Sequence, residues 1–155
     1  MTDIQTRPLF EMEAVLADNQ MVGATPYGQR IIAVTEGGSF EGERLRGRVL
    51  GGGGDWALAR ADMSIALDVR ATLETDDGAL IYVTYGGRWS FPPELFAEFA
   101  DPVAGAKIDP SRYYFRTNPL FETGDERYAW MNNIVAIGTG RRTEKGVAYS
   151  VHEVL

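Results

Sequence analysis

Residues 51–78 of the chain read GGGGDWALARADMSIALDVRATLETDDG, a run of four glycines followed by a long alternating segment. Between Ile65 and Glu74 every second side chain is apolar, and most of those between are polar or charged. A repeat of two residues is the period of a β-strand with one apolar face. The sequence therefore predicts a long strand that is entered through a bent glycine connection.

A second strand follows at once and is expected to form a hairpin with the first. The Asp-Asp-Gly sequence at residues 76–78 suits a three-residue loop in which Gly78 takes the left-handed conformation of a bulged turn. A two-residue loop would mix polar and apolar faces, so we expect the longer loop. The resulting register pairs Leu73 with Ile81, Ala71 with Val83, Val69 with Tyr85, Thr72 with Tyr82 and Arg70 with Thr84.

Other segments also have the composition and period of strands, and glycines separate them. Residues 9–17 contain good helix formers as well, but their alternation favours a strand. The expected strands cover residues 9–17, 30–35, 40–49, 113–123, 128–137 and 147–154. The second of these is expected to stop at Gly37 and Gly38, and Pro119 to mark an edge or a bulge.

One short helix is expected near residues 92–100. Prolines stand at its start, Glu94 lies in its first turn, and Leu95 and Phe99 belong to an apolar stripe. We expect this helix to cover one end of the sheet, with residues 103–110 as a loop. The fold class predicted is all-β, a single antiparallel barrel over residues 1–155.

Composition narrows the classes of function. The chain has 155 residues, 45% of them hydrophobic, which suits one domain with a proper core. Its net charge of −7 disfavours nucleic acid and anionic membranes as partners. It has no cysteine, which excludes disulfides and thiolate chemistry, and no apolar run long enough to span a bilayer. We expect a cytoplasmic protein.

Familiar catalytic and metal-binding motifs are not matched. The glycine run at 51–54 is followed by Asp55 and Trp56 rather than by the residues of a phosphate loop, so a bent connection is favoured. His152 is the single histidine, which leaves a wall residue or a general base as alternatives. The acidic residues lack the spacing of a calcium loop. We expect no metal and no cofactor.

Polar and aromatic side chains share one face of each of two predicted hairpins. They are Asp68, Arg70, Thr72, Tyr82 and Thr84 on one, and Tyr114, Arg116, Glu122, Tyr128, Trp130 and Asn132 on the other. If these faces meet solvent, the sheet is an ordinary amphipathic one. If they turn inward, charges and aromatics converge on one cavity, as in a small-molecule site.

Several of these residues also carry a resemblance to the domain-of-unknown-function 3237 family, or uncharacterised protein family 0311. The matching motifs in the first half are Gly37-Gly38-x-Phe40-x-Gly42, Leu45-x-Gly47-x-Val49-Leu50, Gly53-Gly54-Asp55-Trp56, Leu67-Asp68-x-Arg70 and Thr75-Asp76-Asp77-Gly78. Those in the second half are Tyr114-Phe115-Arg116-Thr117-x-Pro119-x-Phe121-Glu122-Thr123, Tyr128-x-Trp130-x-Asn132 and Tyr149-x-Val151-x-Glu153-Val154. The resemblance implies a small lipocalin-like barrel, and with it an inward polar face. It implies no catalytic role.

The function expected from these residues is binding of a small aromatic or oxygenated molecule inside the barrel. Trp56 and Trp130 would stack on it, and Arg70 and Arg116 would hold an oxyanion. Asp68 and Glu122 are the candidates for proton transfer, in a cofactor-independent isomerase, lyase or hydratase. The full expected ligand-binding set is Asp55, Trp56, Arg70, Tyr82, Tyr114, Arg116, Tyr128, Trp130 and Asn132.

Two alternatives of other classes stay open. The same cavity could serve a non-catalytic carrier or sensor. A structural dimerisation module would instead fill its interior with ion pairs and have no cavity. A homodimer is expected because apolar outer strands would benefit from being covered.

Overall fold

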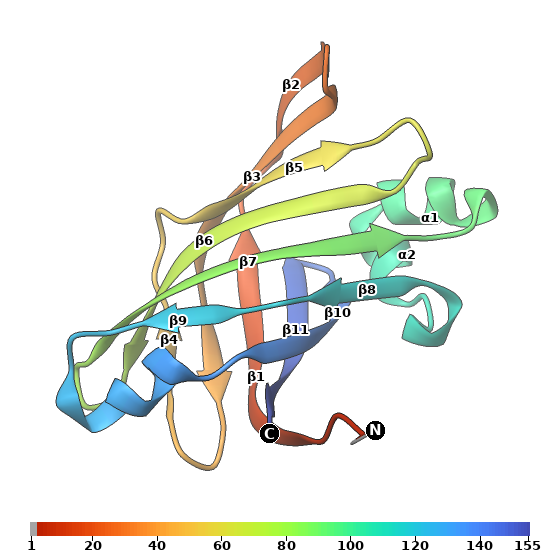
Figure 1. Cartoon of the computed structure of the whole chain (residues 1–155). Helices are drawn as coiled ribbons and strands as arrows, with labels where there is room; N and C mark the ends of the chain where they lie inside the picture. The colour runs from red at the N-terminus through yellow and green to blue at the C-terminus, as the bar shows by residue number, and fades with distance from the viewer. Residues whose placement is uncertain (1–2) are drawn as a thin grey trace.

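The structure, a computed structural model, describes residues 3–155 and is dominated by antiparallel strands (Figure 1). Within these residues eight strands pair side by side into a closed ring, so the predicted all-β barrel is confirmed. In ring order they are β3 (Gly28–Glu41), β1 (Thr6–Leu16), β11 (Gly146–Val154), β10 (Ala136–Thr143), β8 (Tyr114–Thr117), β7 (Leu80–Ser90), β6 (Ile65–Thr75) and β5 (Gly54–Ala59). Pairing of β5 with β3 closes the ring.

Three shorter strands extend the ring. The strand β4 (Arg46–Val49) lies between β3 and β6 beyond the end of β5. The strand β9 (Leu120–Glu122) pairs with β7 beyond the end of β8, after an interruption at Pro119. The strand β2 (Gln20–Thr25) pairs only with β3, and this hairpin projects beyond the rest of the barrel (Figure 1).

The hairpin of β6 and β7 has the predicted register. Leu73 pairs with Ile81, Val69 with Tyr85, and the other expected pairs follow in step. Gly78 has a φ of +88°, the left-handed conformation expected for a bulged turn. The register predicted from the hydrophobic pattern and the loop length is therefore confirmed.

The apolar faces of the strands point into the barrel, where their burial stabilises the ring. One half of the interior is packed solid by side chains from most of the strands. This packed half contains Phe10, Met12, Phe40, Leu73, Ile81, Val83, Phe121, Met131 and Val151. Phe10 contacts both Phe40 and Phe121, with ring centroids 5.5 and 6.0 Å apart.

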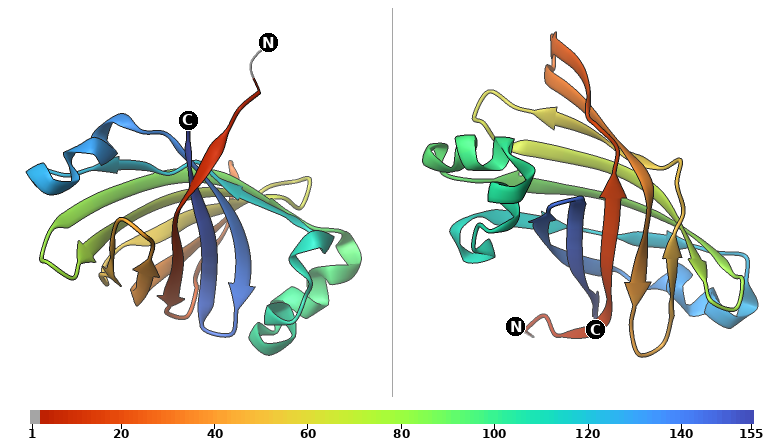
Figure 2. Two further views of the ribbon diagram at one scale, coloured as in Figure 1. Left: turned by 90° about the horizontal axis from the view of Figure 1, so that it is seen from below. Right: turned by 180° about the vertical axis from the view of Figure 1, so that it is seen from behind.

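The two ends of the barrel differ. The packed end carries the β3–β4 and β6–β7 turns, the segment between β9 and β10, and both chain termini (Figure 2). The open end carries the β1–β2, β5–β6 and β10–β11 connections together with the helices that follow β7. These names, packed end and open end, are used below.

Four short helical segments lie between β7 and β8. They are η1 (Pro93–Leu95), α1 (Phe96–Ala100), α2 (Pro102–Ala106) and η2 (Pro110–Arg112). Phe99 of α1 packs edge-on against Trp89 and Tyr113, at 4.9 and 5.2 Å between ring centroids. The helix expected near residues 92–100 is confirmed, and it flanks the open end. No helix among residues 3–155 has the length and apolar character needed to cross a bilayer.

Some expected boundaries were wrong. Residues 103–110 are not all loop, because Pro102 starts α2 and the Asp101 side chain accepts a hydrogen bond from the Ala104 N–H at 2.8 Å. Residues 126–133 form the helix η3 (Glu126–Asn133) rather than a strand. Here Asp125 caps the segment by accepting from the Arg127 N–H, a local bond that competes with the strand period.

The glycines at 37 and 38 bend a strand rather than end it, contrary to expectation. The strand β3 runs through both residues to Glu41, and Gly38 has a φ of +150°. A Cβ at position 38 would lie 2.0 Å from the carbonyl oxygen of Glu13 on β1. Glycine at this position therefore allows β3 to bend and stay in close contact with β1, as barrel closure requires.

Replacing Gly38 by alanine is expected to lower the free energy of unfolding by about 1–3 kcal/mol, since the new Cβ clashes with backbone. Gly37→Ala is the matched control, because its Cβ would lie 3.7 Å from the nearest backbone oxygen. Urea unfolding of the two variants checks this. Equal stability of both variants would contradict the argument.

Candidate functional site

A cavity of about 120 Å³ occupies the open half of the barrel. Its walls come from inward-facing residues of all eight ring strands and from the β1–β2 connection. They are Ala14, Leu16, Asn19, Ile31, Ala33, Thr35, Asp55, Ala57, Ile65, Leu67, Val69, Tyr85, Trp89, Phe115, Arg142, Val147 and Tyr149. An engineered protein cavity of roughly 150 Å³ holds benzene, so this space suits a molecule of about one ring.

Asp55 is the carboxylate in this lining. It lies on β5 opposite Val69 of β6 and Ala33 of β3, midway along the barrel. Its Oδ1 accepts a hydrogen bond from the Asp68 backbone N–H at 2.9 Å. Burial nevertheless raises the pKa of Asp55 to about 6, because the apolar surroundings disfavour its charged form. This carboxylate can therefore both take up and release a proton near neutral pH.

Two buried tyrosines line the same cavity as Asp55. Tyr85 on β7 and Tyr149 on β11 have ring centroids 5.6 Å apart in an edge-on arrangement. Burial raises the pKa of both phenols, and the charge of Asp55 adds to the effect. Both hydroxyls therefore keep their protons at neutral pH and can donate hydrogen bonds to a ligand oxygen.

Nearer the open end, Trp89 and Arg142 add two nitrogen donors to the cavity wall. Among residues 3–155, the Trp89 Nε1 and Arg142 Nε atoms are buried without a hydrogen-bond partner. Trp89 stacks on Phe115 at 5.2 Å between centroids, and Phe115 in turn contacts Tyr149 edge-on. Gly140 leaves room for the Phe115 ring, since a Cβ there would lie 2.7 Å from it.

The polar face of β6 lies outside the barrel, so the expected inward orientation was wrong. Asp68 and Arg70 are exposed and pair with each other at 2.8 Å. The Arg70 guanidinium lies 5.8 Å from the ring of Trp56, which is 37% exposed on the outer surface of β5. The physical reason is the apolar face opposite, which has no second layer to cover it and must itself turn inward.

The second predicted polar face is outside as well. Arg116 donates to its neighbour's carbonyl and lies 5.1 Å from the ring of Tyr114, which is 53% exposed. Tyr82 and Glu122 form an exposed cross-strand pair of β7 and β9. None of these four lines the cavity, so the geometric argument for their binding or catalytic roles is lost.

Tyr128, Trp130 and Asn132 belong to η3 and hold the packed end together, far from the cavity. The Tyr128 hydroxyl donates to Asp77 in the β6–β7 turn at 3.0 Å. The Asn132 amide exchanges two hydrogen bonds with the Thr123 backbone. The Arg44 guanidinium lies 4.0 Å from the Trp130 ring centroid.

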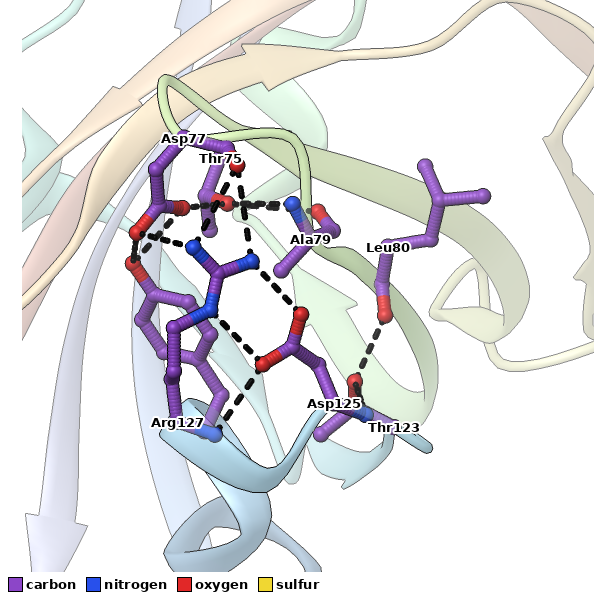
Figure 3. A network of polar contacts seen from close by, with 8 residues as sticks. Thr75, Asp77, Ala79, Leu80, Thr123, Asp125 and Arg127 are labelled. Atoms are coloured by element: carbon purple, nitrogen blue, oxygen red, sulfur yellow. Dashed lines mark hydrogen bonds and ion pairs between the residues drawn. The ribbon is translucent and has the colours of Figure 1, made fainter.

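Figure 3 shows the network that joins this helix to the β6–β7 turn. Arg127 pairs with Asp125 at 2.7 Å and with Asp77 at 3.1 Å. Thr75 donates to Asp77 at 2.5 Å and accepts from the Ala79 N–H at 2.8 Å. These contacts fix the β6–β7 turn and η3 to each other. The motifs at residues 75–78 and 128–132 therefore have a structural role.

His152 lies on the outer side of β11, where its Nδ1 is 3.4 Å from the Thr6 hydroxyl. It does not line the cavity, which agrees with the wall-residue alternative. Within residues 3–155, no group of three or more His, Asp or Glu side chains is arranged to hold a metal ion.

Sequence reasoning found one cavity residue, Asp55, and missed the others that matter. Tyr85 could have been found, because the predicted register already placed it opposite Val69 on the apolar face. On β10, Arg142 lies on the same face of the strand as Gly138 and Gly140. Had this glycine-containing face been assigned to the interior, Arg142 would have been predicted to point inward too. Neither pattern in the sequence distinguishes a ligand site from ordinary core packing, because that distinction depends on how the ring of strands closes.

Comparisons with known proteins bear on the whole chain. A family model described as "Protein of unknown function (DUF3237)" matches residues 4–154. A UPF0311 protein of Rhodopseudomonas palustris is 36% identical over 152 residues, covering 98% of this chain and 97% of the relative. The crystal structure of a conserved R. palustris protein of unknown function has a TM-score of 0.92 at 34% identity, with both chains fully covered.

A more distant likeness extends to a fungus. The crystal structure of a protein described as an enzyme from Penicillium herquei has a TM-score of 0.74, covering 100% of this chain and 97% of its own. Its sequence is 22% identical, so the likeness concerns the fold alone.

The raised pKa of Asp55 predicts an unusual dependence of stability on pH. The folded state holds this proton more tightly than the unfolded chain, so the wild type loses stability as pH rises from 3.8 through about 6. Asp55→Asn removes the titration and keeps an acceptor for the Asp68 N–H. Above this window the stability of the variant relative to wild type should be about 2–3 kcal/mol higher than it is in acid, because only the wild type loses stability through the window. Chemical unfolding across the pH range measures the difference, and parallel curves would contradict it.

Proposed function

The chain belongs to the DUF3237 family of proteins of unknown function, and from its cavity we propose that it binds a small oxygenated organic molecule and moves a proton on it. The reaction classes that fit are isomerase, lyase and hydratase chemistry. The proton-accepting and hydrogen-bonding groups that such a reaction needs are side chains of this chain, so the proposal requires no cofactor.

The observation that carries the proposal is the Asp55 carboxylate in a mostly apolar cavity. A general base works best when its pKa lies near the working pH, and burial raises that of Asp55 to about 6. The cavity also restricts water around the base, which increases its strength toward a bound C–H or O–H group. Asp68, by contrast, is exposed on the outer face of the barrel.

In the proposed step, the ionised Asp55 removes a proton from a carbon next to a carbonyl group. The C–H electron pair moves into a new carbon–carbon double bond, and the carbonyl electrons move to its oxygen, which becomes an enolate. The neutral hydroxyls of Tyr85 and Tyr149 belong to the same cavity lining and are suited to hydrogen-bond that oxyanion. Return of the proton to another position, or loss of a leaving group, completes an isomerisation or an elimination.

Binding without chemistry is the second candidate, and the mostly apolar lining favours it. A carrier needs shape and a few polar contacts, and this cavity offers both. A structural module with a filled interior is disfavoured, because the open half of the barrel is hollow.

We also propose that the protein is cytoplasmic and that two copies of it pair. Exposed apolar side chains on the outer face of β8, β9 and β10, among them Tyr114, Leu120 and Ile137, support pairing.

Exchange of the α-hydrogens of cyclohexanone for deuterium, followed by NMR, tests the base with a probe of one ring. Wild-type protein should accelerate the exchange, and the rate should rise with pH along one ionisation near 6. Asp55→Asn should lose the acceleration, since an amide cannot accept the proton. Asp68→Asn, on the outer face, is the matched control and should keep it. Equal rates for wild type and Asp55→Asn would refute the enzymatic proposal and favour the carrier.

Filling the cavity tests where the molecule binds. Ala57 is 6% exposed and lines the cavity, so Ala57→Leu should reduce binding of cyclohexanone, measured by calorimetry, by about tenfold or more. Ala66→Leu on the neighbouring strand β6, at the parity opposite to the inward Leu67, should leave binding unchanged. Unchanged binding in Ala57→Leu would place the molecule elsewhere.

A further inference from the structure

Beyond the proposed function, on which this inference rests, we propose that the molecule carries a carboxylate, held at the open end by Arg142 and Trp89. The substrate class is then a small carboxylic acid with about one ring. Its carboxylate lies toward the open end, and the carbon that loses a proton lies deeper, toward Asp55.

The first reason is that Arg142 has no carboxylate partner. Among residues 3–155 no Asp or Glu oxygen lies within 4.0 Å of its guanidinium, although eight other ion pairs are formed. Arg142 is half-buried. A charge withdrawn from water without a partner is costly, so its retention in a cavity wall favours an anion that arrives with the ligand. Burial also lowers the pKa of Arg142, as expected where no carboxylate offsets the desolvation.

The second reason is the pair of buried donors. Arg142 Nη1 donates to the Gly146 carbonyl at 3.2 Å, which holds the side chain across the β10–β11 hairpin, while its Nε has no partner. Trp89 Nε1 is likewise buried and unpaired. Unpaired donors of this kind are rare inside proteins, and both belong to residues of the cavity wall.

The third reason is the arrangement of charge. Trp89 on β7 and Arg142 on β10 flank β8, and Phe115 of β8 separates them. Tyr149 on β11 lines the same cavity and lies opposite Gly140, two residues before Arg142 on β10. A carboxylate at the basic end accepts from both donors, because each of its oxygens has free lone pairs. It also stays away from the negative charge of Asp55.

Calorimetric titration with benzoate and benzamide tests the inference, because these one-ring probes match in shape and differ in charge. Wild-type protein should bind benzoate at least about tenfold more tightly than benzamide at neutral pH. Arg142→Met should abolish this preference while benzamide still binds. Trp89→Phe keeps the stacked ring, loses the N–H donor and should weaken benzoate binding by about twofold to tenfold.

Arg141→Met is the matched control, since Arg141 lies next along β10 with its side chain exposed on the outer face. It should keep the wild-type preference for benzoate. Should Arg142→Met not fold, the wild-type ratio and Trp89→Phe decide the matter.

Four results would overturn the inference or a part of it. Equal affinity for both probes in the wild type, or a benzoate preference that survives Arg142→Met, rejects the carboxylate site and leaves the Asp55 proposal standing. Unchanged benzoate affinity in Trp89→Phe rejects the role of the indole. Failure of both probes to bind rejects the cavity as a binding site, and the proposed function with it.

Discussion

One closed ring of strands has to bury one face of every strand, and the rest of the structure depends on this constraint. Residues 3–155, which the structure describes, form no second layer of sheet or helix that would cover an apolar outer surface of the ring. The alternating Leu, Val and Ile side chains of β6 and β7 therefore point inward, where removing them from water supplies much of the stabilisation. Few polar side chains lie in the interior, and burial there changes their pKa values and leaves some of them without hydrogen-bond partners.

Those few interior groups gain properties that their counterparts on the outer face lack. Asp55 and Asp68 lie on neighbouring strands, but Asp55 lines the cavity, where burial raises its pKa, whereas Asp68 is exposed on the outer face. Arg70 finds Asp68 at 2.8 Å in solvent, whereas Arg142 stays inside the barrel without a carboxylate. Whether a charged side chain lies inside or outside the ring, more than its residue type, distinguishes the residues of the candidate site from the charged residues of the surface.

Much of the fold was predictable because local rules and the barrel agree. The β6–β7 register, the left-handed Gly78 and the short helix before β8 each follow from pattern and turn chemistry. The alternation of residues 128–137 was misleading, because capping by Asp125 and the contacts of η3 outweigh strand period there. At Gly37 and Gly38, a bend needed for closure could not be distinguished from a strand end.

The site was less predictable, for a reason that lies in the ring itself. The alternation along each strand groups side chains correctly but does not say which group faces inward. The resemblance to a family of lipocalin-like barrels favoured the polar group. Asp55 was found because it accompanies Trp56 after the glycine run. Tyr85, Trp89, Arg142 and Tyr149 come from three strands, and only closure of the ring brings them to one space with Asp55.

The division of the interior into a packed half and a hollow half has an evolutionary consequence. The packed half, with Phe10, Leu73, Ile81 and Met131, holds the ring together irrespective of what occupies the other. Substitutions at hollow-half positions such as Ile31 or Ala57 can thus reshape the chamber at little cost to folding. The same barrel can in this way evolve to bind different small molecules through substitutions at a few residues of the cavity wall.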